Sequence, residues 1–269
     1  MTTQEIIAPL GHTIIALSSA PEDEVGENTV QAWIEHLNSV SDAINQKPAI
    51  LIVPFSDIDQ AELFAANSQI ETSYRVVCVC YHGAHGFEPE LAGAMAAALA
   101  DSNDPALPFD GVNLGGIPAV GDEYKLTFER IEAALNKGVC MIDTGADGLP
   151  EIVRAVSTYR VNPDSGADDD LMLDINGALI VDYTRKVIRS DLAKERRRKN
   201  TAAQRRNVRS IILRRLIQLD DAEILQNVRA RADQLIVIED ANDRYRANAR
   251  IPADWVRGMH IIDGTLDIY

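Results

Sequence analysis

Apolar residues along this chain fall into two patterns, and the first is typical of buried β-strands. Near-continuous runs of Val, Ile, Leu and Cys occupy residues 49–55 (AILIVPF), 75–81 (RVVCVCY) and 139–143 (VCMID). Such runs predict strands that are covered on both faces, as in a parallel or mixed sheet. Shorter strands are expected at 12–17 (HTIIAL) and at 153–160 (VRAVSTYR).

The second pattern places apolar residues at steps of three and four, which is typical of amphipathic helices. It predicts helices over residues 28–44, 59–67, 88–101 and 125–137, and these alternate with the strand-like runs. Helices that alternate with short apolar strands indicate an α/β fold, an open mixed sheet core with flanking helices.

The pattern changes after a polar turn at 162–170 (NPDSGADDD). Long helices are expected over 170–192 and 208–219, and strands follow at 234–239 and 244–250. This order predicts an α+β C-terminal domain. The predicted parts are an N-terminal arm (1–20), an α/β core domain (21–160), a C-terminal helical and hairpin domain (161–258) and a C-terminal arm strand (259–269).

Strand-like sequence also lies at both ends of the chain. The stretch HTIIAL precedes the first core element, and MHIIDGTLDIY forms the last residues, 259–269. Terminal strands are suited to β-augmentation, in which an extended arm adds a strand to the sheet of a neighbour. The alternative is that both ends pair with the chain's own sheet. Pairing of some kind is expected, because an open strand edge promotes aggregation.

Charge is distributed unevenly along the chain, which has a net charge of −15. Residues 1–184 carry a net charge of −22, and residues 185–269 carry +7. The basic segment 194–206 (KERRRKNTAAQRR) lies between two predicted helices. It is interpreted as a solvated helix face, a nucleic-acid site or a docking site for an acidic partner. Because aromatic residues for base stacking are absent between Tyr183 and Tyr245, an acidic protein surface fits at least as well as nucleic acid.

No pattern of catalytic, cofactor-binding or metal-binding residues is found, so we expect neither enzymatic activity nor a cofactor. His82 and His85 are close in sequence, but a zinc site would need two further ligands. No serine lies in a G-x-S-x-G motif, and no phosphate-binding loop is present. No apolar run is long enough to cross a bilayer, so no membrane partner is expected.

Five segments occur in an order and spacing that can be compared with a known family. They are ELAGAMAAALAD (90–101), DPALP (104–108), GVNLGGIP (111–118), ERIEAALNKGV (129–139) and IVRAVSTYR (152–160). In this order they resemble the core of contractile tail sheath proteins, particularly the Mu-like group. The resemblance covers residues 49–160 and continues more loosely through the long helix at 171–192 and the C-terminal strand.

The resemblance implies a structural protein that polymerises as stacked hexameric rings around a tail tube. Contraction of such a sheath, without a nucleotide, drives the tube through the envelope of the target cell. The implied partners are other copies of the chain, a tail tube protein, and baseplate and tail terminator proteins. The implied location is the virion tail, after assembly in the host cytoplasm.

Two alternatives to a main sheath protein stay open. The chain has no room for the extra outward-facing domains of most sheaths, which also fits a sheath-derived collar or terminator protein. A soluble nucleic-acid-binding α/β protein that uses residues 194–209 is the other alternative.

The resemblance also implies roles for particular segments. Sheath arms add strands to the C-terminal domain of neighbours, and a basic face of that domain contacts the tube. The implied arms are residues 2–17 and 259–269, and the implied receiving hairpin comprises 234–239 and 244–250. The residues expected in these intersubunit strands are Ile6, Ile7, Thr13, Ile14, Ile15, Leu235, Val237, Tyr245, Ile261, Ile262, Leu266 and Ile268. The residues expected to contact the tube are Arg196, Arg197, Arg198, Lys199, Arg205, Arg206 and Arg209.

Overall fold

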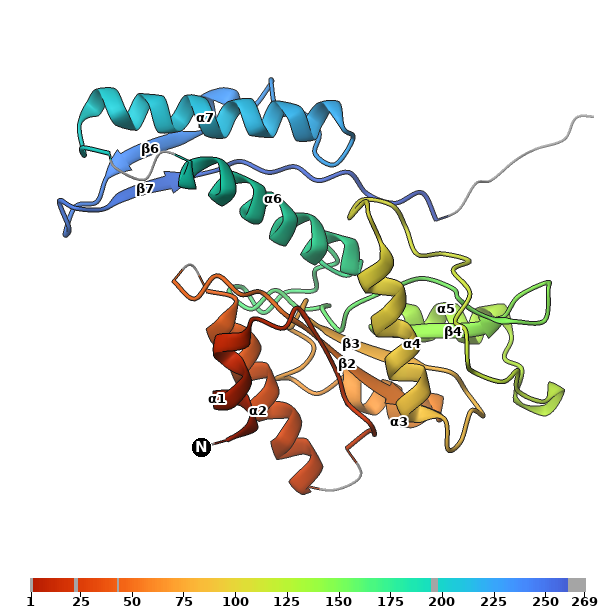
Figure 1. Ribbon diagram of the computed structural model, residues 1–269. Helices are drawn as coiled ribbons and strands as arrows, with labels where there is room; N and C mark the ends of the chain where they lie inside the picture. The colour runs from red at the N-terminus through yellow and green to blue at the C-terminus, as the bar shows by residue number, and fades with distance from the viewer. Residues whose placement is uncertain (1, 22–23, 43, 195–197, 261–269) are drawn as a thin grey trace, which may run out of the picture. The chain divides into compact units, whose positions relative to one another are not determined.

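The computed structural model has one mixed sheet flanked by helices and a second, two-stranded sheet (Figure 1). It describes residues 2–21, 24–42, 44–194 and 198–260. The chain forms two compact units. Unit 1 comprises residues 1–103, 107–178 and 259–269, and unit 2 comprises residues 104–106 and 179–258. The polar turn at 162–170 therefore lies inside unit 1.

The sheet of unit 1 has five strands in the order β1-β2-β3-β4-β5. The first four strands are mutually parallel, and β5 runs antiparallel to β4. This architecture confirms the mixed sheet expected from the apolar runs. The strands are β1 (Ile14–Ala16), β2 (Ile50–Phe55), β3 (Val76–Cys80), β4 (Val139–Thr144) and β5 (Pro150–Ile152).

Helices cover this sheet and exclude solvent from its central strands. Helix α4 packs on β1 and β2, α3 packs on β3, and α5 packs on β4 (Figure 1). Every residue of β2 and β3 is buried. The helices of the unit are α1 (Thr3–Ile7), α2 (Glu24–Val40), α3 (Ile58–Ala65), α4 (Glu88–Asp101) and α5 (Phe128–Asn136).

The helix ends follow from local side-chain chemistry. The Asp57 carboxylate accepts hydrogen bonds from the first amides of α3, and the Thr127 hydroxyl accepts one from the first turn of α5. Helix α5 ends before Gly138, whose φ of 80° lies in the left-handed region that glycine adopts without strain.

The three cysteines fill the sheet core. Burial raises the pKa of Cys140 to about 12, and the Cys78 thiol contacts the carbonyl oxygen of Ala61 at 3.6 Å. Thiols in such surroundings stay protonated and unreactive, so these residues act as small apolar side chains.

The strand prediction for the first residues is wrong. Ile6 and Ile7 belong to helix α1, which begins with a reciprocal capping box between Thr2 and Glu5. A 3₁₀ turn, Ala8–Leu10, follows directly. The capping box satisfies two of the amides at the helix start, and this favours one helical turn over a strand.

The strand prediction for residues 153–160 is also wrong. The amide of Ser157 donates to Leu173, whereas that of Thr158 donates to Val76. Neighbouring backbone groups thus bond to different segments, and a continuous ladder cannot form along them. The antiparallel strand at this edge is the shorter β5, just before this stretch.

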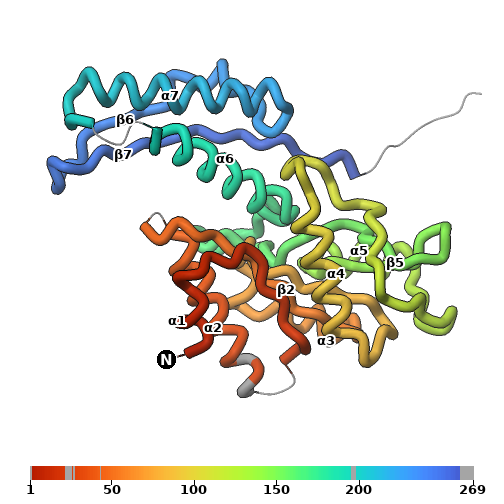
Figure 2. The backbone as a smooth tube through the Cα atoms, viewed as in Figure 1, coloured from red at the N-terminus to blue at the C-terminus, as the bar shows by residue number. Residues whose placement is uncertain are grey.

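Unit 2 is built on two long helices and a hairpin. They are α6 (Ile175–Ala193), which begins in unit 1, α7 (Ala202–Asp221), β6 (Ile236–Glu239) and β7 (Ala247–Arg250). Helix α7 lies along β6 (Figure 2). Ile212, Leu216 and Leu219 of α7 are buried in an apolar cluster that Trp255 also joins.

We expect Leu216→Ala to destabilise unit 2 strongly. Leu216 is 1% exposed, and truncation of a buried leucine costs about 2–5 kcal/mol in the free energy of unfolding. Urea denaturation followed by circular dichroism measures this loss. Leu213→Ala makes the same change at a partly buried position of the same helix and should cost less. Equal losses at both positions would contradict the assigned core.

Candidate assembly surfaces

The β6–β7 hairpin is held by its own turn. Its strands pair antiparallel, with Ile236 opposite Arg250 and Glu239 opposite Ala247. In the turn, the Asp240 carboxylate accepts hydrogen bonds from the amides of Asn242 (2.8 Å) and Asp243 (3.0 Å). These bonds, the Asn242 amide foremost, lower the pKa of Asp240 below its ordinary value. The hairpin is therefore preformed.

The outer side of this hairpin is open. Val237 packs against the core of unit 2, whereas Ile236 and Ile238 on the other face are 44% and 55% exposed. All residues of β7 are exposed. Within the described ranges, no third strand pairs with either edge. An isolated two-stranded hairpin is only marginally stable in water, and its open backbone groups can pair with an added strand.

Two residues expected in the hairpin strands lie outside them. Leu235 precedes β6 and is 1% exposed, because it belongs to the apolar cluster of unit 2. Tyr245 is 99% exposed and lies in the turn, where its amide donates to the Asp243 carboxylate at 2.9 Å. Val237 is the predicted hairpin residue that does lie in a strand.

The N-terminal segment pairs with its own chain. Ile14 and Ile15 lie in β1, opposite Ile50 and Leu51 of β2. The carbonyl oxygen of Thr13 accepts a hydrogen bond from the Ile50 amide at 2.9 Å. In a single chain these residues therefore occupy the edge of the unit 1 sheet. The predicted C-terminal strand residues Ile261, Ile262, Leu266 and Ile268 lie outside the described residues.

Two arginines of the predicted tube-contact set face their own unit. Arg205 forms an ion pair with Glu239 at 3.0 Å. The Arg209 guanidinium donates to the carbonyl oxygens of Leu235, at 2.7 Å, and Ala232. Both tie α7 to the hairpin region and stabilise unit 2.

The outward charge on α7 comes from a different pair of arginines. Arg206 and Arg214 are both exposed and lie on one stripe of the helix, at positions i and i+8. Their side chains and that of exposed Lys199 make no hydrogen bond or ion pair within the described part of the chain. The Arg198 guanidinium donates to the Leu192 carbonyl oxygen at 3.0 Å, and Arg196 and Arg197 lie outside the described residues.

A partly buried ion pair joins the two helices of unit 2. The Asp191 carboxylate of α6 accepts hydrogen bonds from Arg215 of α7 at 2.6 Å and from Lys194 at 2.7 Å. The guanidinium of Arg215, followed by the Lys194 ammonium, holds the pKa of Asp191 well below its ordinary value.

We expect Asp191→Asn to weaken unit 2 in a pH-dependent way. A carboxyl group whose pKa is depressed by folding stabilises the protein above its unfolded-state pKa, about 3.9. That stabilisation is lost as the pH falls through the folded-state pKa. The urea midpoint of the variant should lie below that of the wild type at pH 7, and the gap should shrink at pH 3. Asp233→Asn, at an exposed position, is the control, and a gap independent of pH would contradict the assignment.

The histidine pair after β3 takes part in aromatic packing. The rings of His82 and His85 lie edge-on to Tyr124, with centroids 6.0 and 5.9 Å away. The His85 Nδ1 is 3.1 Å from the Ser56 hydroxyl. Across the described residues, no group of three or more His, Cys, Asp or Glu side chains is placed to hold a metal ion.

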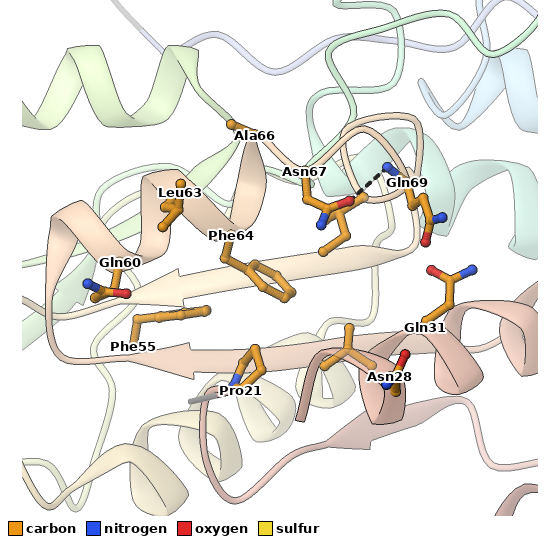
Figure 3. A pocket seen from close by; sticks show the side chains of 12 residues that line it. Pro21, Asn28, Gln31, Phe55, Gln60, Leu63, Phe64, Ala66, Asn67 and Gln69 are labelled. Carbon is orange, nitrogen blue, oxygen red and sulfur yellow. Dashed lines mark hydrogen bonds between the residues drawn. The ribbon is translucent and has the colours of Figure 1, made fainter. Parts of the chain in front are cut away.

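A pocket in unit 1 has an apolar floor and an amide rim (Figure 3). The rings of Phe55 and Phe64 lie 5.1 Å apart, and Gln31, Gln60 and Asn67 are among the surrounding amides. None of the twelve described residues that line it is charged or nucleophilic. Such a lining offers no group for acid–base or nucleophilic catalysis. Separately, no helix of the described part is both long and apolar enough to span a bilayer.

Comparison with known proteins identifies the fold. No family model and no curated protein matches the sequence. Among solved structures, the helical sheath of the anti-feeding prophage in its contracted state matches with a TM-score of 0.66 at 18% identity, over 98% of this chain and 72% of that chain. A chain of the anti-feeding prophage baseplate matches with a TM-score of 0.64 at 17% identity, over 95% of this chain and 69% of that one.

A third structure extends the likeness to another source. The sheath tail protein of Desulfitobacterium hafniense matches with a TM-score of 0.61 at 16% identity. The match covers 88% of this chain but only 52% of that protein. The chain therefore has the fold of tail sheath proteins, as the resemblance of its sequence predicted, and spans about half to three quarters of the chains it matches.

Proposed function

We propose that this protein is a tail sheath subunit that polymerises around a tail tube. The observation that carries the proposal is the likeness to a contracted prophage sheath over 98% of the chain. The open hairpin of unit 2 supports it, because a polymer held by strand addition needs such an edge. The function requires no catalytic group.

Strand addition is the proposed link between subunits. Residues 259–269 of one subunit would add a strand to the β6–β7 hairpin of a neighbour. The N-terminal arm, with Thr13–Ile15, would leave the edge of its own sheet and join the same exchange. Repetition of these links produces stacked hexameric rings whose subunits stay connected.

The outward stripe of α7 is the proposed tube-binding surface. Arg206 and Arg214 would carry it, together with Lys199, Arg196 and Arg197 from the preceding basic segment. Exposed ion pairs contribute about 0.2–1 kcal/mol each, so many copies hold the sheath on an acidic tube while each contact remains easy to break. On contraction the subunits would then move as nearly rigid bodies, while the exchanged strands keep them linked.

A second candidate function is a sheath-derived protein at one end of the tail. The match to a chain of the anti-feeding prophage baseplate favours it. In both cases the implied partners are tube, baseplate and terminator proteins, and the implied location is the tail of a virion or a related particle.

Sedimentation with and without a candidate tube protein tests the proposal. A main sheath protein should form large polymers that grow with protein concentration and bind the tube less at high salt. An end protein should instead stop at a single ring size. A monodisperse small species under all conditions, with no tube binding, would contradict both.

A further inference from the structure

His260 is clamped between two carboxylates at the point where the C-terminal arm begins. Its Nδ1 lies 2.6 Å from Asp110 Oδ2, and its Nε2 lies 3.4 Å from Asp174 Oδ2. Asp110 follows α4 by nine residues, and Asp174 directly precedes α6. The His260 side chain is only 16% exposed, so solvent screens these interactions little.

The geometry constrains the protons of the ring. At 2.6 Å, Nδ1 must carry a proton that it donates to Asp110, because two lone pairs would repel at this distance. A neutral ring then presents the lone pair of Nε2 to the Asp174 carboxylate. A protonated ring donates to both carboxylates, and it is the form that satisfies the whole site.

One further charged group faces this site. The Arg154 guanidinium donates to both oxygens of Asp174, from Nε at 2.8 Å and Nη2 at 3.0 Å. It fixes the position of the Asp174 carboxylate, and it offsets part of the attraction between that carboxylate and the ring. In the described part of the chain, His260 is the only side chain that can offer a positive charge to Asp110. The carboxylate of Asp110 therefore depends on the His260 ring for a favourable charge interaction.

We propose that Asp110, His260 and Asp174 form a proton-controlled clamp on the root of the C-terminal arm. Histidine is the side chain whose charge ordinarily changes between pH 5 and 8. Protonation closes the clamp and fixes Met259 and His260 on unit 1, to which they belong. Loss of the proton keeps the hydrogen bond from Nδ1 to Asp110 but leaves the Nε2 lone pair facing the Asp174 carboxylate, and this repulsion loosens the root of the arm.

The clamp would regulate strand exchange, and this consequence rests on the proposed function. The nine residues that follow His260 form the arm proposed to join a neighbouring hairpin. When Met259 and His260 are fixed, the first residue of the arm has a defined position. Less conformational entropy is then lost when the arm pairs with the hairpin of a neighbour. Assembly should therefore be favoured at mildly acidic pH.

Hydrogen exchange of the full-length chain, kept dilute enough to remain unassembled, tests the clamp directly. After correction for the intrinsic rate, the amides of Met259 and His260 should be protected about tenfold better at pH 5.5 than at pH 8, the effect expected of one charge-assisted hydrogen bond. His260→Gln should show the lower protection at both pH values. Asp110→Asn should likewise lose most of the pH dependence.

His12→Gln, which removes an exposed histidine elsewhere, is the matched control and should keep the wild-type profile. A flat profile in the wild type, or an unchanged profile in His260→Gln, would overturn the clamp. The readout needs no polymer. If the chain never polymerises, the proposed function fails while hydrogen exchange still decides whether the clamp exists.

Discussion

A chain that ends at His260 should fold and fail to polymerise. Among the described residues, the buried apolar side chains of both units lie within residues 30–255, and removal of residues 261–269 leaves all of them in the chain. The clamp on His260 also keeps its residues. What disappears is the segment proposed to add a strand to the β6–β7 hairpin of a neighbour. We expect a thermal midpoint close to that of the wild type and only small particles by sedimentation.

Proline substitution tests strand addition by the C-terminal arm without shortening the chain. Ile262→Pro with Leu266→Pro removes two backbone donors that an added strand needs, and it should also abolish polymerisation. Ile262→Ala with Leu266→Ala keeps the donors and should weaken assembly less. Polymers of wild-type size from the deletion or the proline variant would exclude strand addition by this arm.

Reversal of the charges at Arg206 and Arg214 should release the sheath from its tube without unfolding it. Both side chains are exposed on α7 and lack a partner in the described part of the chain, so Arg206→Glu with Arg214→Glu breaks no internal bond. At about 0.2–1 kcal/mol per exposed pair, the loss per subunit is small. The loss of binding free energy adds up over the many subunits bound to one tube. Co-sedimentation with an acidic tube protein should therefore disappear.

Two controls separate charge from structure in this experiment. Arg206→Lys with Arg214→Lys keeps the charge and should retain tube binding. Arg209→Ala removes a side chain that donates to the carbonyl oxygens of Leu235 and Ala232, so it should lower stability. Tube binding by the double Glu variant at wild-type strength would show that the stripe is not the tube surface.

The sequence predicts the sheet core well because one physical signal dominates there. Strands β2, β3 and β4 are near-continuous apolar runs, and such short runs are typical of strands that are buried on both faces of a sheet. Helix α4 matches its predicted bounds, residues 88–101, since acidic residues and Pro89 mark its start.

The misplaced elements have causes that the apolar pattern does not express. Ile6 and Ile7 have the composition of strand residues, but the capping box of Thr2 and Glu5 places them in a helix. Residues 153–160 have strand composition, yet their amides bond to separate segments. A backbone pairing pattern of this kind is set by tertiary structure.

In the basic segment, the position of each arginine around helix α7 decides whether it faces its own unit or solvent. Arg205 and Arg209 share a stripe with buried Ile212 and Leu216, and this spacing was visible in the sequence. It could have separated them from Arg206 and Arg214, which lie on the outer stripe. The clamp of His260 had no such signal, because its two carboxylates lie 150 and 86 residues away along the chain.

Negative-stain electron microscopy of the purified full-length protein tests the central claim most directly. The account predicts stacked rings or hollow tubes of uniform diameter, formed by the protein alone or on addition of a candidate tube protein. Small dispersed particles at high concentration, with and without that tube protein and from pH 5.5 to pH 8, would contradict a sheath function.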